Sequence, residues 1–441
     1  MAANDSAADD SVVYDTRVDD AAPPDAAAGP PPAALGPLPR ELFVLVALLV
    51  IAHTALNGIR VATSLAAIKA GGGALWVGLL TAMFNLVPAF IAIRVGRLVD
   101  RVPLRRMMVV GCVVSVAGGL LAALLPMLGI LAFSACALGV GWMMVAAAAQ
   151  YAVGLLGHVG VPAAATSEQS TAQLAAQRAA HVATQRVRAF SVLAMGFSLS
   201  AFFGPLIAGF MIDHVSFQAA FALLAALPLI PAVAFALGHP LLPAVERRET
   251  PPGNGARELL AMPSVRNTLI SASFITVGWD LYGFMVPVLG SELMLTATQI
   301  GSVMSVFAAA VFAIRFFMAR LTHRYGEVGV MVGAMTIAGV TFLAFAFAHS
   351  YALMLVLSFA MGIGLGASQP IVLSLLHNVS PPGRIGEVNG MRMTMISTSQ
   401  WTMPLVFGSL SAFTGLLPLF VVIGGGILGG SWFARRNLPR V

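Results

Sequence analysis

The sequence predicts an all-α, polytopic membrane protein with twelve transmembrane helices, arranged as two halves of six. Composition is the first reason: 59% of the 441 residues are apolar, only 10% are charged, and the mean hydropathy is +0.90. A soluble domain carries about 25% charged residues. The second reason is a series of long apolar runs, and the third is a repeat that relates the two parts of the chain. The length is therefore divided into membrane spans rather than soluble domains.

The apolar runs begin after Glu41 and continue almost to the end of the chain. Each is long enough to cross about 30 Å of hydrocarbon. The alternation of a membrane β-strand is missing, and a backbone in lipid must pair its own polar groups, so the runs predict helices. The predicted helices are 42–65, 74–95, 107–125, 127–153, 186–212, 216–237, 267–290, 297–318, 328–348, 350–377, 385–412 and 415–434.

The segments outside the helices complete the expected layout. Residues 1–40 are rich in Ala, Pro and Asp and lack the basic start and apolar stretch of a signal peptide, so we expect a disordered acidic tail. The expected parts are this tail, an N-terminal bundle over 41–237 with a polar loop insertion at 157–188, a central loop at 238–266, a C-terminal bundle over 267–434 and a second tail at 435–441.

The basic residues predict the orientation. With both termini inside, all but two of the 24 Lys and Arg residues lie in inner segments or at the inner edge of a helix, and the exceptions are Arg60 and Lys69. Because Lys and Arg concentrate in cytoplasmic loops, we expect cytoplasmic termini and a place in the inner or plasma membrane. This bias also explains the pI of about 10.0, so we expect no nucleic-acid partner.

Two shifts of the sequence reveal an internal repeat. A shift of 223 residues places 77–101 on 300–324, and a shift of 199 relates later segments. The aligned pairs include Gly78 with Gly301, Phe84 with Phe307, Gly139 with Gly362, Pro205 with Pro404 and Gly209 with Gly408. Two repeated halves of six helices are typical of secondary transporters, in which the halves rock around a site near the midplane.

The segment 96–106, GRLVDRVPLRR, resembles the loop between helices two and three of the major facilitator superfamily, G-x-L-x-D-R-x-G-R-R. Gly96, Asp100, Arg101 and Arg105 match, whereas Pro103 stands where the family usually has Gly. The resemblance implies a gate motif, in which Asp100 accepts from a helix N-terminus or an arginine only when the inner side is closed. The alternative is that the arginines only set the topology.

A second segment, SAFFGPLIAG at 200–209, resembles the helix-five motif of the superfamily's proton-coupled drug exporters. Gly204, Pro205 and Gly209 match it. The resemblance implies a twelve-helix exporter of drugs or metabolites, while simple tight packing of small residues is the alternative. The helix-four arginine of those exporters is missing, and Gln150 is the polar residue nearest its place.

Polar and charged side chains inside the predicted helices mark the candidate site. His53, Asn57 and Arg60 recur at helical spacing on one face of the first helix, and Asp280 is the acidic residue nearest mid-membrane. The resemblance places the first and seventh helices across the cavity from each other, so we expect an Arg60–Asp280 pair, direct or through water. Charges within a membrane usually serve function, so a substrate or proton site is expected. A structural salt bridge is the alternative, and His53 is equally interpretable as a polar core residue.

Further cavity candidates are uncharged polar residues at similar depth. They are Asn85, Gln369, Ser397 and Gln400. Such side chains also hold helices together, so each is a weaker candidate for a substrate contact.

These patterns predict a secondary active transporter of a small molecule, most readily a proton-coupled exporter acting as a monomer without cofactor or metal. Uptake of an organic anion or metabolite is the main alternative, because a single cavity arginine can hold a carboxylate. A transporter-like sensor that has lost transport is a remoter one. An enzyme is not expected, because no paired acids, metal cluster or nucleophile–base pair is evident.

Overall fold

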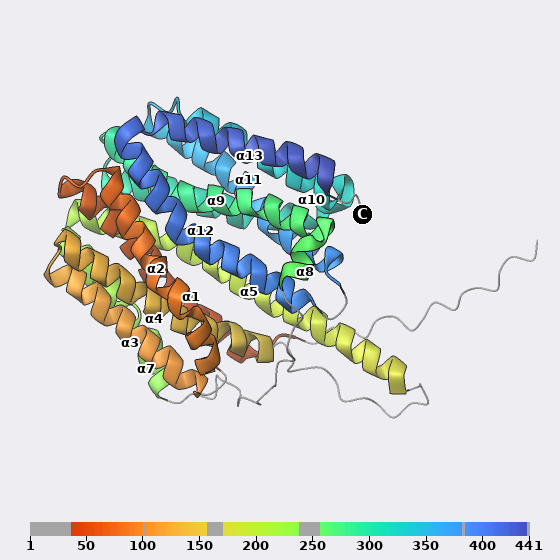
Figure 1. Ribbon diagram of the computed structural model, residues 1–441. Helices are drawn as coiled ribbons and strands as arrows, with labels where there is room; N and C mark the ends of the chain where they lie inside the picture. Colours follow the sequence, from red (N-terminus) through yellow and green to blue (C-terminus); the bar gives the residue numbers. More distant parts are fainter. Residues whose placement is uncertain (1–36, 100–101, 157–170, 238–255, 382–383, 439–441) are drawn as a thin grey trace, which may run out of the picture. The chain divides into compact units, whose positions relative to one another are not determined.

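The structure is a computed structural model that describes residues 37–99, 102–156, 171–237, 256–381 and 384–438. This part of the chain is helical and contains no strand, which confirms the all-α prediction (Figure 1). The helices are α1 (Arg40–Lys69), α2 (Ala74–Val99), α3 (Leu104–Leu124), α4 (Leu128–Leu156), α5 (Thr171–His214), α6 (Phe217–Ala226), α7 (Leu229–Ala236), α8 (Ala256–Ala261), α9 (Pro263–Glu292), α10 (Ala297–Phe345), α11 (Tyr351–Val379), α12 (Ile385–Thr414) and α13 (Leu417–Asn437).

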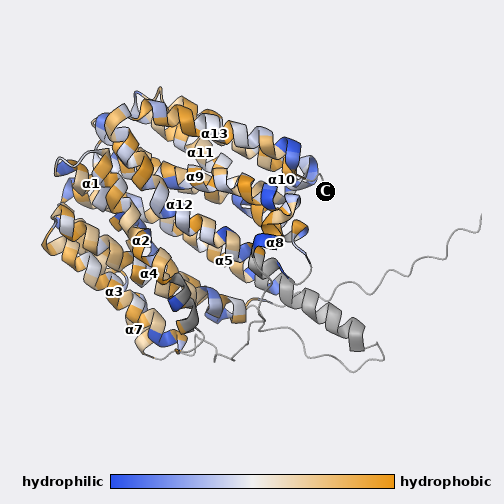
Figure 2. Cartoon of the chain, viewed as in Figure 1, coloured by the Kyte–Doolittle hydropathy of each residue, from blue (hydrophilic) through white to orange (hydrophobic). Residues whose placement is uncertain are grey.

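The described helices are long and apolar enough for a multi-pass membrane protein. Eleven segments meet both criteria. The twelfth predicted span, 385–412, forms α12, whose 30 residues reach about 45 Å at 1.5 Å per residue. α12 falls short only in hydropathy, because Thr, Ser and Gln residues fill its middle. Figure 2 shows hydrophobic residues along the helices and hydrophilic ones around α8 and the C-terminal end of α13.

Several helix boundaries differ from the predicted ones. α5 begins at Thr171, so residues 171–188 of the expected polar loop continue a helix; this stretch has no Gly or Pro and many Ala and Gln residues, which favour helix. The remainder of that loop, 157–170, lies outside the described residues. α9 begins at Pro263 rather than 267, and the short α8 occupies part of the expected central loop.

Two predicted spans each contain a break. The sixth consists of α6 and α7, which are separated next to Pro228. The eighth and ninth form α10, which is interrupted at Gly326, where φ is 70° and ψ is 163°. A positive φ of this kind suits glycine, which has no Cβ to clash. Among the described residues each half therefore contains six spans, and an even number of spans returns the chain to the face where it started. We call that face, where α1 begins and α13 ends, the terminal face.

The repeat appears in the structure as paired helix contacts. A Cβ on Gly139 of α4 would overlap the carbonyl oxygen of Phe84 in α2, and a Cβ on Gly362 of α11 would overlap that of Phe307 in α10. These four residues are two of the pairs that the shift of 223 aligns. The equivalent crossings in the two halves therefore need glycine for the same reason, which is close backbone approach.

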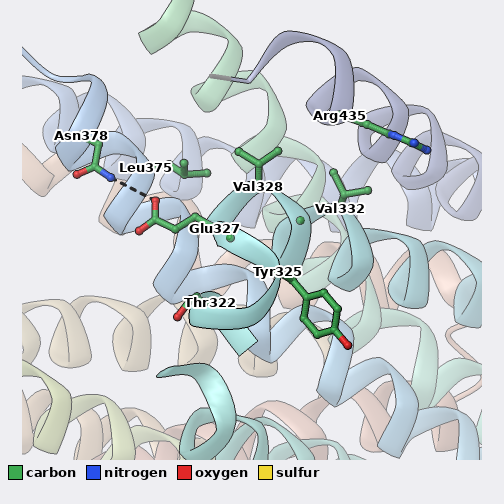
Figure 3. Close-up of a pocket in the computed structure, with 10 residues that line it drawn as sticks. Thr322, Tyr325, Glu327, Val328, Val332, Leu375, Asn378 and Arg435 are labelled. Atoms are coloured by element: carbon green, nitrogen blue, oxygen red, sulfur yellow. Dashed lines mark hydrogen bonds between the residues drawn. The ribbon is translucent and has the colours of Figure 1, made fainter. Parts of the chain in front are cut away.

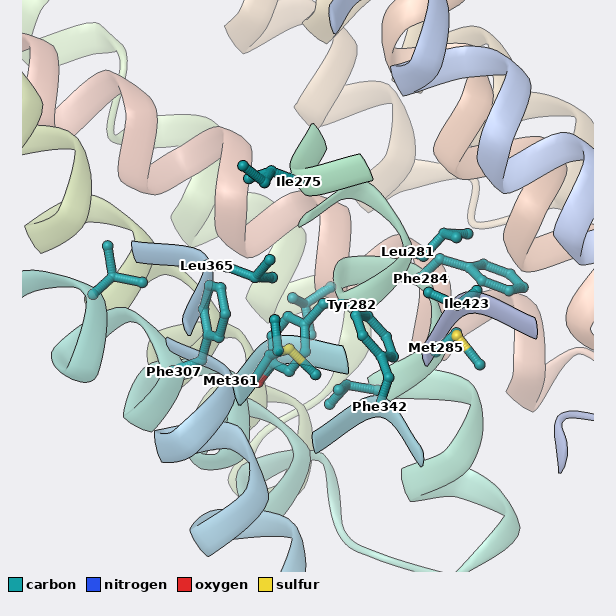
Figure 4. Close-up of a cluster of buried hydrophobic side chains, with 14 of the residues drawn as sticks. Ile275, Leu281, Tyr282, Phe284, Met285, Phe307, Phe342, Met361, Leu365 and Ile423 are labelled. Carbon is teal, nitrogen blue, oxygen red and sulfur yellow. The ribbon is translucent and has the colours of Figure 1, made fainter. Parts of the chain in front are cut away.

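Aromatic and aliphatic side chains fill the centre of the C-terminal half. Tyr282 stacks on Phe307 with ring centroids 4.1 Å apart, and Phe345 stacks on Phe420 at 5.9 Å. Figure 4 shows Tyr282 and Phe307 beside Phe342, Met361 and Leu365, which belong to α10 and α11. This packing positions α9, and with it Asp280, against the neighbouring helices.

Candidate functional site

A cavity of about 190 Å³ lies between helices of the two halves. Its lining comes from α1, α2 and α5 of the first half and from α9, α10 and α12 of the second. The polar lining residues are Asn57, Arg60, Ser64, Thr81, Asn85, Asp280 and Gln400, and the large apolar and aromatic ones include Trp279, Tyr282, Met304 and Phe307. Arg60 and Asp280 are the charged side chains among the described lining residues.

Two seams of small residues join the halves on the side of this cavity away from the terminal face. In one seam, a Cβ on Gly301 of α10 would overlap the carbonyl oxygen of Pro205 in α5. In the other, a Cβ on Gly78 of α2 would overlap the carbonyl oxygen of Pro404 in α12. The seams are equivalent under the sequence repeat. Because backbone meets backbone in both, the two halves are in direct contact on the side of the cavity opposite the terminal face.

Arg60 lies in the cavity wall with few partners. Its Nη2 donates to Asn85 Oδ1 over 3.4 Å, near the upper limit for a hydrogen bond. Its Nε is buried without a partner among the described residues. The guanidinium lies over the ring of Phe84, 5.3 Å from the centroid. The cation–π contact offsets part of the cost of the buried charge, but most of the five N–H donors have no strong acceptor.

Asp280 lies on the α9 side of the same cavity. Its Oδ2 accepts a hydrogen bond of 2.8 Å from Ser399 Oγ of α12. Ser399 is buried, with 8% of its surface exposed. No direct ion pair joins Asp280 to Arg60, and the one salt bridge in the described part of the chain links Arg384 to Glu258 at 2.8 Å. The direct form of the expected pair is therefore not seen, although both charged residues line the same cavity.

His53 lies behind the cavity wall rather than in its lining. Its Nδ1 is 2.5 Å from Ser200 Oγ and 3.3 Å from Asn57 Nδ2. The imidazole stacks on Trp142 with centroids 4.4 Å apart and lies 4.8 Å from the ring of Phe197. These contacts are those of the polar core residue considered as the alternative, although Asn57 connects His53 to the cavity.

The other polar candidates divide into two groups. Asn57, Asn85 and Gln400 line the cavity, and Asn85 Nδ2 donates to the backbone oxygen of Gln400 over 3.5 Å. Gln369 and Ser397 are half-buried and are not among its lining residues. Distance along an apolar helix gives depth but does not fix which neighbour a side chain faces.

Sequence reasoning missed several contributors to the site. Ser399, which holds Asp280, lies in the polar run 394–402 between two residues that were considered. Thr81 and the aromatic residues Trp279, Tyr282 and Phe307 also line the cavity. The position of Ser399 around the helix could not identify it as the partner of Asp280. The packing of α12 against α9 decides which hydroxyl in this run reaches the carboxylate.

A second, larger hollow of about 550 Å³ lies near the break in α10. Figure 3 shows Glu327, Tyr325 and Val332 around it, with Asn378 donating to Glu327 over 3.2 Å. Its described lining comes from α10, α11 and α13 alone. Because only one half contributes, movement between the halves would not expose this hollow to alternate sides, and it is a weaker candidate for a transport site.

Comparisons with known proteins identify the fold. Residues 268–440 match the family model described as Major Facilitator Superfamily. The whole fold is similar to a crystal structure of a peptide transporter POT with sulfate, at a TM-score of 0.68, 14% identity, and coverage of 90% of this chain and 94% of that one. The family match covers the C-terminal part of the chain, and the likeness to the solved structure shows that the chain shares its fold. No curated protein sequence matches the chain.

Two further solved structures are similar. One is a POT family transporter with a thioalcohol-conjugated peptide, at a TM-score of 0.68 and 13% identity, covering 90% of this chain and 96% of that one. The other is a bacterial homologue of the human lysosomal transporter Spinster, at 0.63 and 15%, covering 91% and 96%. Identities this low establish a shared fold and leave substrate and direction open.

The segment that resembles the superfamily's helix-five motif packs against α1 of its own half and against α10 of the other half. A Cβ on Gly204 would lie 2.8 Å from the backbone nitrogen of Gly58 in α1, and one on Gly209 would overlap the carbonyl oxygen of Ala297 in α10. Pro205 between them lines the cavity. The motif residues therefore pack tightly and also border the candidate site.

The superfamily's gate motif is only partly described. Asp100 and Arg101 lie outside the described residues, and Gly96 lies within α2. Arg105 donates from Nη2 to the carbonyl oxygen of Ala236 at the end of α7. In this conformation Arg105 thus binds a helix C-terminus of its own half, where a cation is favoured.

Proposed function

We propose that this chain is a secondary active transporter that moves a small molecule by alternating access and couples that movement to protons. The observation that carries the proposal is the placement of Arg60 and Asp280 in one cavity between the halves, each with few partners. A site between two rocking halves can be reached from each side in turn. Asp280 is proposed as the proton-carrying group because it is the acidic residue of the described lining.

Export from the cell is the direction that the helix-five resemblance supports. Gly204, Pro205 and Gly209 match the motif of the proton-coupled exporters and lie beside the cavity. The proposal includes a single-chain protein in the inner or plasma membrane, with both termini cytoplasmic. It requires no cofactor or metal, since gradient-driven rocking needs only a substrate and a coupling ion.

A second candidate is proton-coupled uptake of an organic anion. The observation that favours it is the incomplete hydrogen bonding of Arg60, whose Nε has no partner among the described residues. A guanidinium in this condition binds a carboxylate well, because two parallel N–H donors match its two oxygens.

The test is growth of a sensitive bacterial strain that expresses the protein across a panel of toxic compounds, with and without an uncoupler. Export predicts protection from at least one compound, and uptake predicts sensitisation. In either direction, the uncoupler and Asp280→Asn should both abolish the effect, while Ser397→Ala at equal expression should keep it. An effect that survives Asp280→Asn would contradict proton carriage by this residue. No effect from any compound would favour a sensor over a transporter.

A further inference from the structure

We infer that the cavity binds a small monocarboxylate with an apolar body, and that the carboxylate and a proton bind together, the first at Arg60 and the second at Asp280. The inference rests on the proposed proton coupling. It develops the second candidate described above, uptake, because a proton that binds with the substrate drives movement in the direction of the proton gradient.

The carboxylate is assigned from the state of Arg60. Its strongest described hydrogen bond is the 3.4 Å contact to Asn85, and Phe84 covers one face of the guanidinium. The neighbouring Ser64 donates its hydroxyl proton to the Arg60 carbonyl at 3.1 Å, and no hydrogen bond joins Ser64 to the guanidinium among the described residues. A buried cation with unused donors is best satisfied by an anion that accepts two hydrogen bonds.

The joint binding of a proton follows from the charge balance of the cavity. With Arg60 positive and Asp280 negative, the empty cavity is neutral. A carboxylate alone would make it negative, and a proton alone would make it positive. Either state is costly in a medium of low dielectric constant. When a carboxylate binds at Arg60 and Asp280 takes up one proton, the loaded cavity is neutral again. The empty cavity and the fully loaded cavity are therefore the states in which the protein changes from one open side to the other most easily.

Other ionisable groups near the cavity do not upset this balance. The Tyr282 hydroxyl has two acceptors for its single proton, Ser358 Oγ at 3.0 Å and the Val303 carbonyl oxygen at 3.3 Å. His53 lies behind Asn57, outside the lining. Arg315 of α10 donates to the Ala194 carbonyl and to Ser198 Oγ, both at 2.7 Å, and is also outside the lining.

The size and walls of the cavity define the body of the substrate. Its volume of about 190 Å³ is below the range of about 300–1,000 Å³ for drug-sized ligands. Trp279 and Phe307 contribute aromatic surfaces 5.1 Å apart in an edge-to-face arrangement, and Met304 adds a flexible apolar contact. A single small apolar or aromatic group suits such walls.

The test measures binding of three molecules of the same shape to the purified full-length protein in detergent: benzoate, neutral benzamide and cationic benzamidine. Ligand binding raises the thermal unfolding midpoint, and the stabilisation grows with the logarithm of the ligand concentration divided by Kd when that ratio is large. We expect benzoate to bind at least about tenfold more tightly than either isostere, because only its charge complements Arg60. Equal binding of the three, or no saturable binding of benzoate, would overturn the inference.

Variants separate the two roles. Arg60→Gln should weaken benzoate binding at least about tenfold, whereas Arg315→Gln, at a matched arginine outside the lining, should not. In weakly buffered solution the wild-type protein should take up a proton when it binds benzoate, while Asp280→Asn should bind benzoate without proton uptake. If Arg60→Gln does not fold, the ranking of the three isosteres in the wild type still decides the carboxylate assignment.

The outcomes distinguish this inference from the proposed function. Benzoate binding without proton uptake in the wild type would overturn the joint binding of anion and proton. Loss of benzoate binding in Asp280→Asn would show that Asp280 holds the substrate, which would overturn the division of roles. Failure of benzoate to bind, together with uncoupler-sensitive growth effects that need Asp280, would leave proton-coupled transport standing and discard the carboxylate.

Discussion

The residues of the candidate site differ in whether the sequence alone could identify them. Arg60 and Asp280 could be selected from the sequence because a charge inside an apolar helix is costly and stands out. Ser399 could not, because it is one of several hydroxyl residues in 394–402 and only the packing of α12 brings it within 2.8 Å of Asp280. Ser397, two residues earlier, was selected and lies outside the cavity lining.

This difference makes a prediction within one helix. Ser399→Ala removes the hydrogen bond to the Asp280 carboxylate, a bond worth about 1.5–3 kcal/mol when one partner is charged. We expect Ser399→Ala to lower the uncoupler-sensitive growth effect described above, because the charged state of Asp280 loses its described donor. Ser397→Ala is the matched control and should leave the effect unchanged. Equal effects of the two variants would mean that the serine hydroxyls act only in helix packing.

The separation of Arg60 and Asp280 predicts how they couple. Arg60→Ala leaves Asp280 as an uncompensated charge near the membrane centre, whereas the double change to Ala and Asn leaves no charge. We therefore expect Arg60→Ala to destabilise the folded protein more than the double variant, with a coupling of at least about 0.5 kcal/mol despite the absence of contact. Thermal unfolding in detergent measures all four proteins. Additive effects would mean that the cavity screens the two charges from each other.

At the scale of helices, α5 and α10 are joined by a contact that the repeat does not share. Asp213, near the end of α5, accepts hydrogen bonds from the backbone nitrogens of Ala297 at 3.0 Å and Thr298 at 2.6 Å, in the first turn of α10. A carboxylate at a helix N-terminus satisfies unpaired N–H groups and the helix dipole. The repeat places Ala412 at the equivalent position of α12, so the seam between α2 and α12 lacks this cap.

Removal of the Asp213 cap should loosen the junction opposite the terminal face. We expect Asp213→Ala to favour conformations open on that side by about 1 kcal/mol, or about fivefold in population. A cysteine at Thr81 should then react faster with an impermeant thiol reagent applied from that side. Glu292→Gln, which alters an exposed acidic residue near the end of α9, is the control. An unchanged Thr81→Cys reaction rate in Asp213→Ala would mean that the glycine seams alone hold the junction closed.

At the scale of the whole molecule, the sequence predicted what periodicity and composition determine. The runs located the helices because hydrocarbon requires apolar spans of fixed length. The repeat located glycine contacts because equivalent crossings in the two halves need the same small residues, as at Gly139 and Gly362. The breaks in α10 and beside Pro228 and the early start of α5 depend on local backbone geometry, which hydropathy does not report. The absence of a direct Arg60–Asp280 contact depends on the relative placement of the halves, which no single helix encodes.

The orientation of the molecule remains a prediction from its arginines. If the terminal face is cytoplasmic, Lys69 at the end of α1 and Glu292 at the end of α9 lie outside, while Arg257 of α8 lies inside. In a background with Cys112 and Cys136 replaced by Ala, single cysteines at Lys69 and Glu292 should react with an impermeant thiol reagent added to intact cells. A cysteine at Arg257 should react only after the membrane is permeabilised, because Arg-rich segments stay on the cytoplasmic side. The reverse pattern would overturn the orientation. It would also place the Asp213 junction and the two glycine seams on the cytoplasmic side of the cavity instead of the outer side.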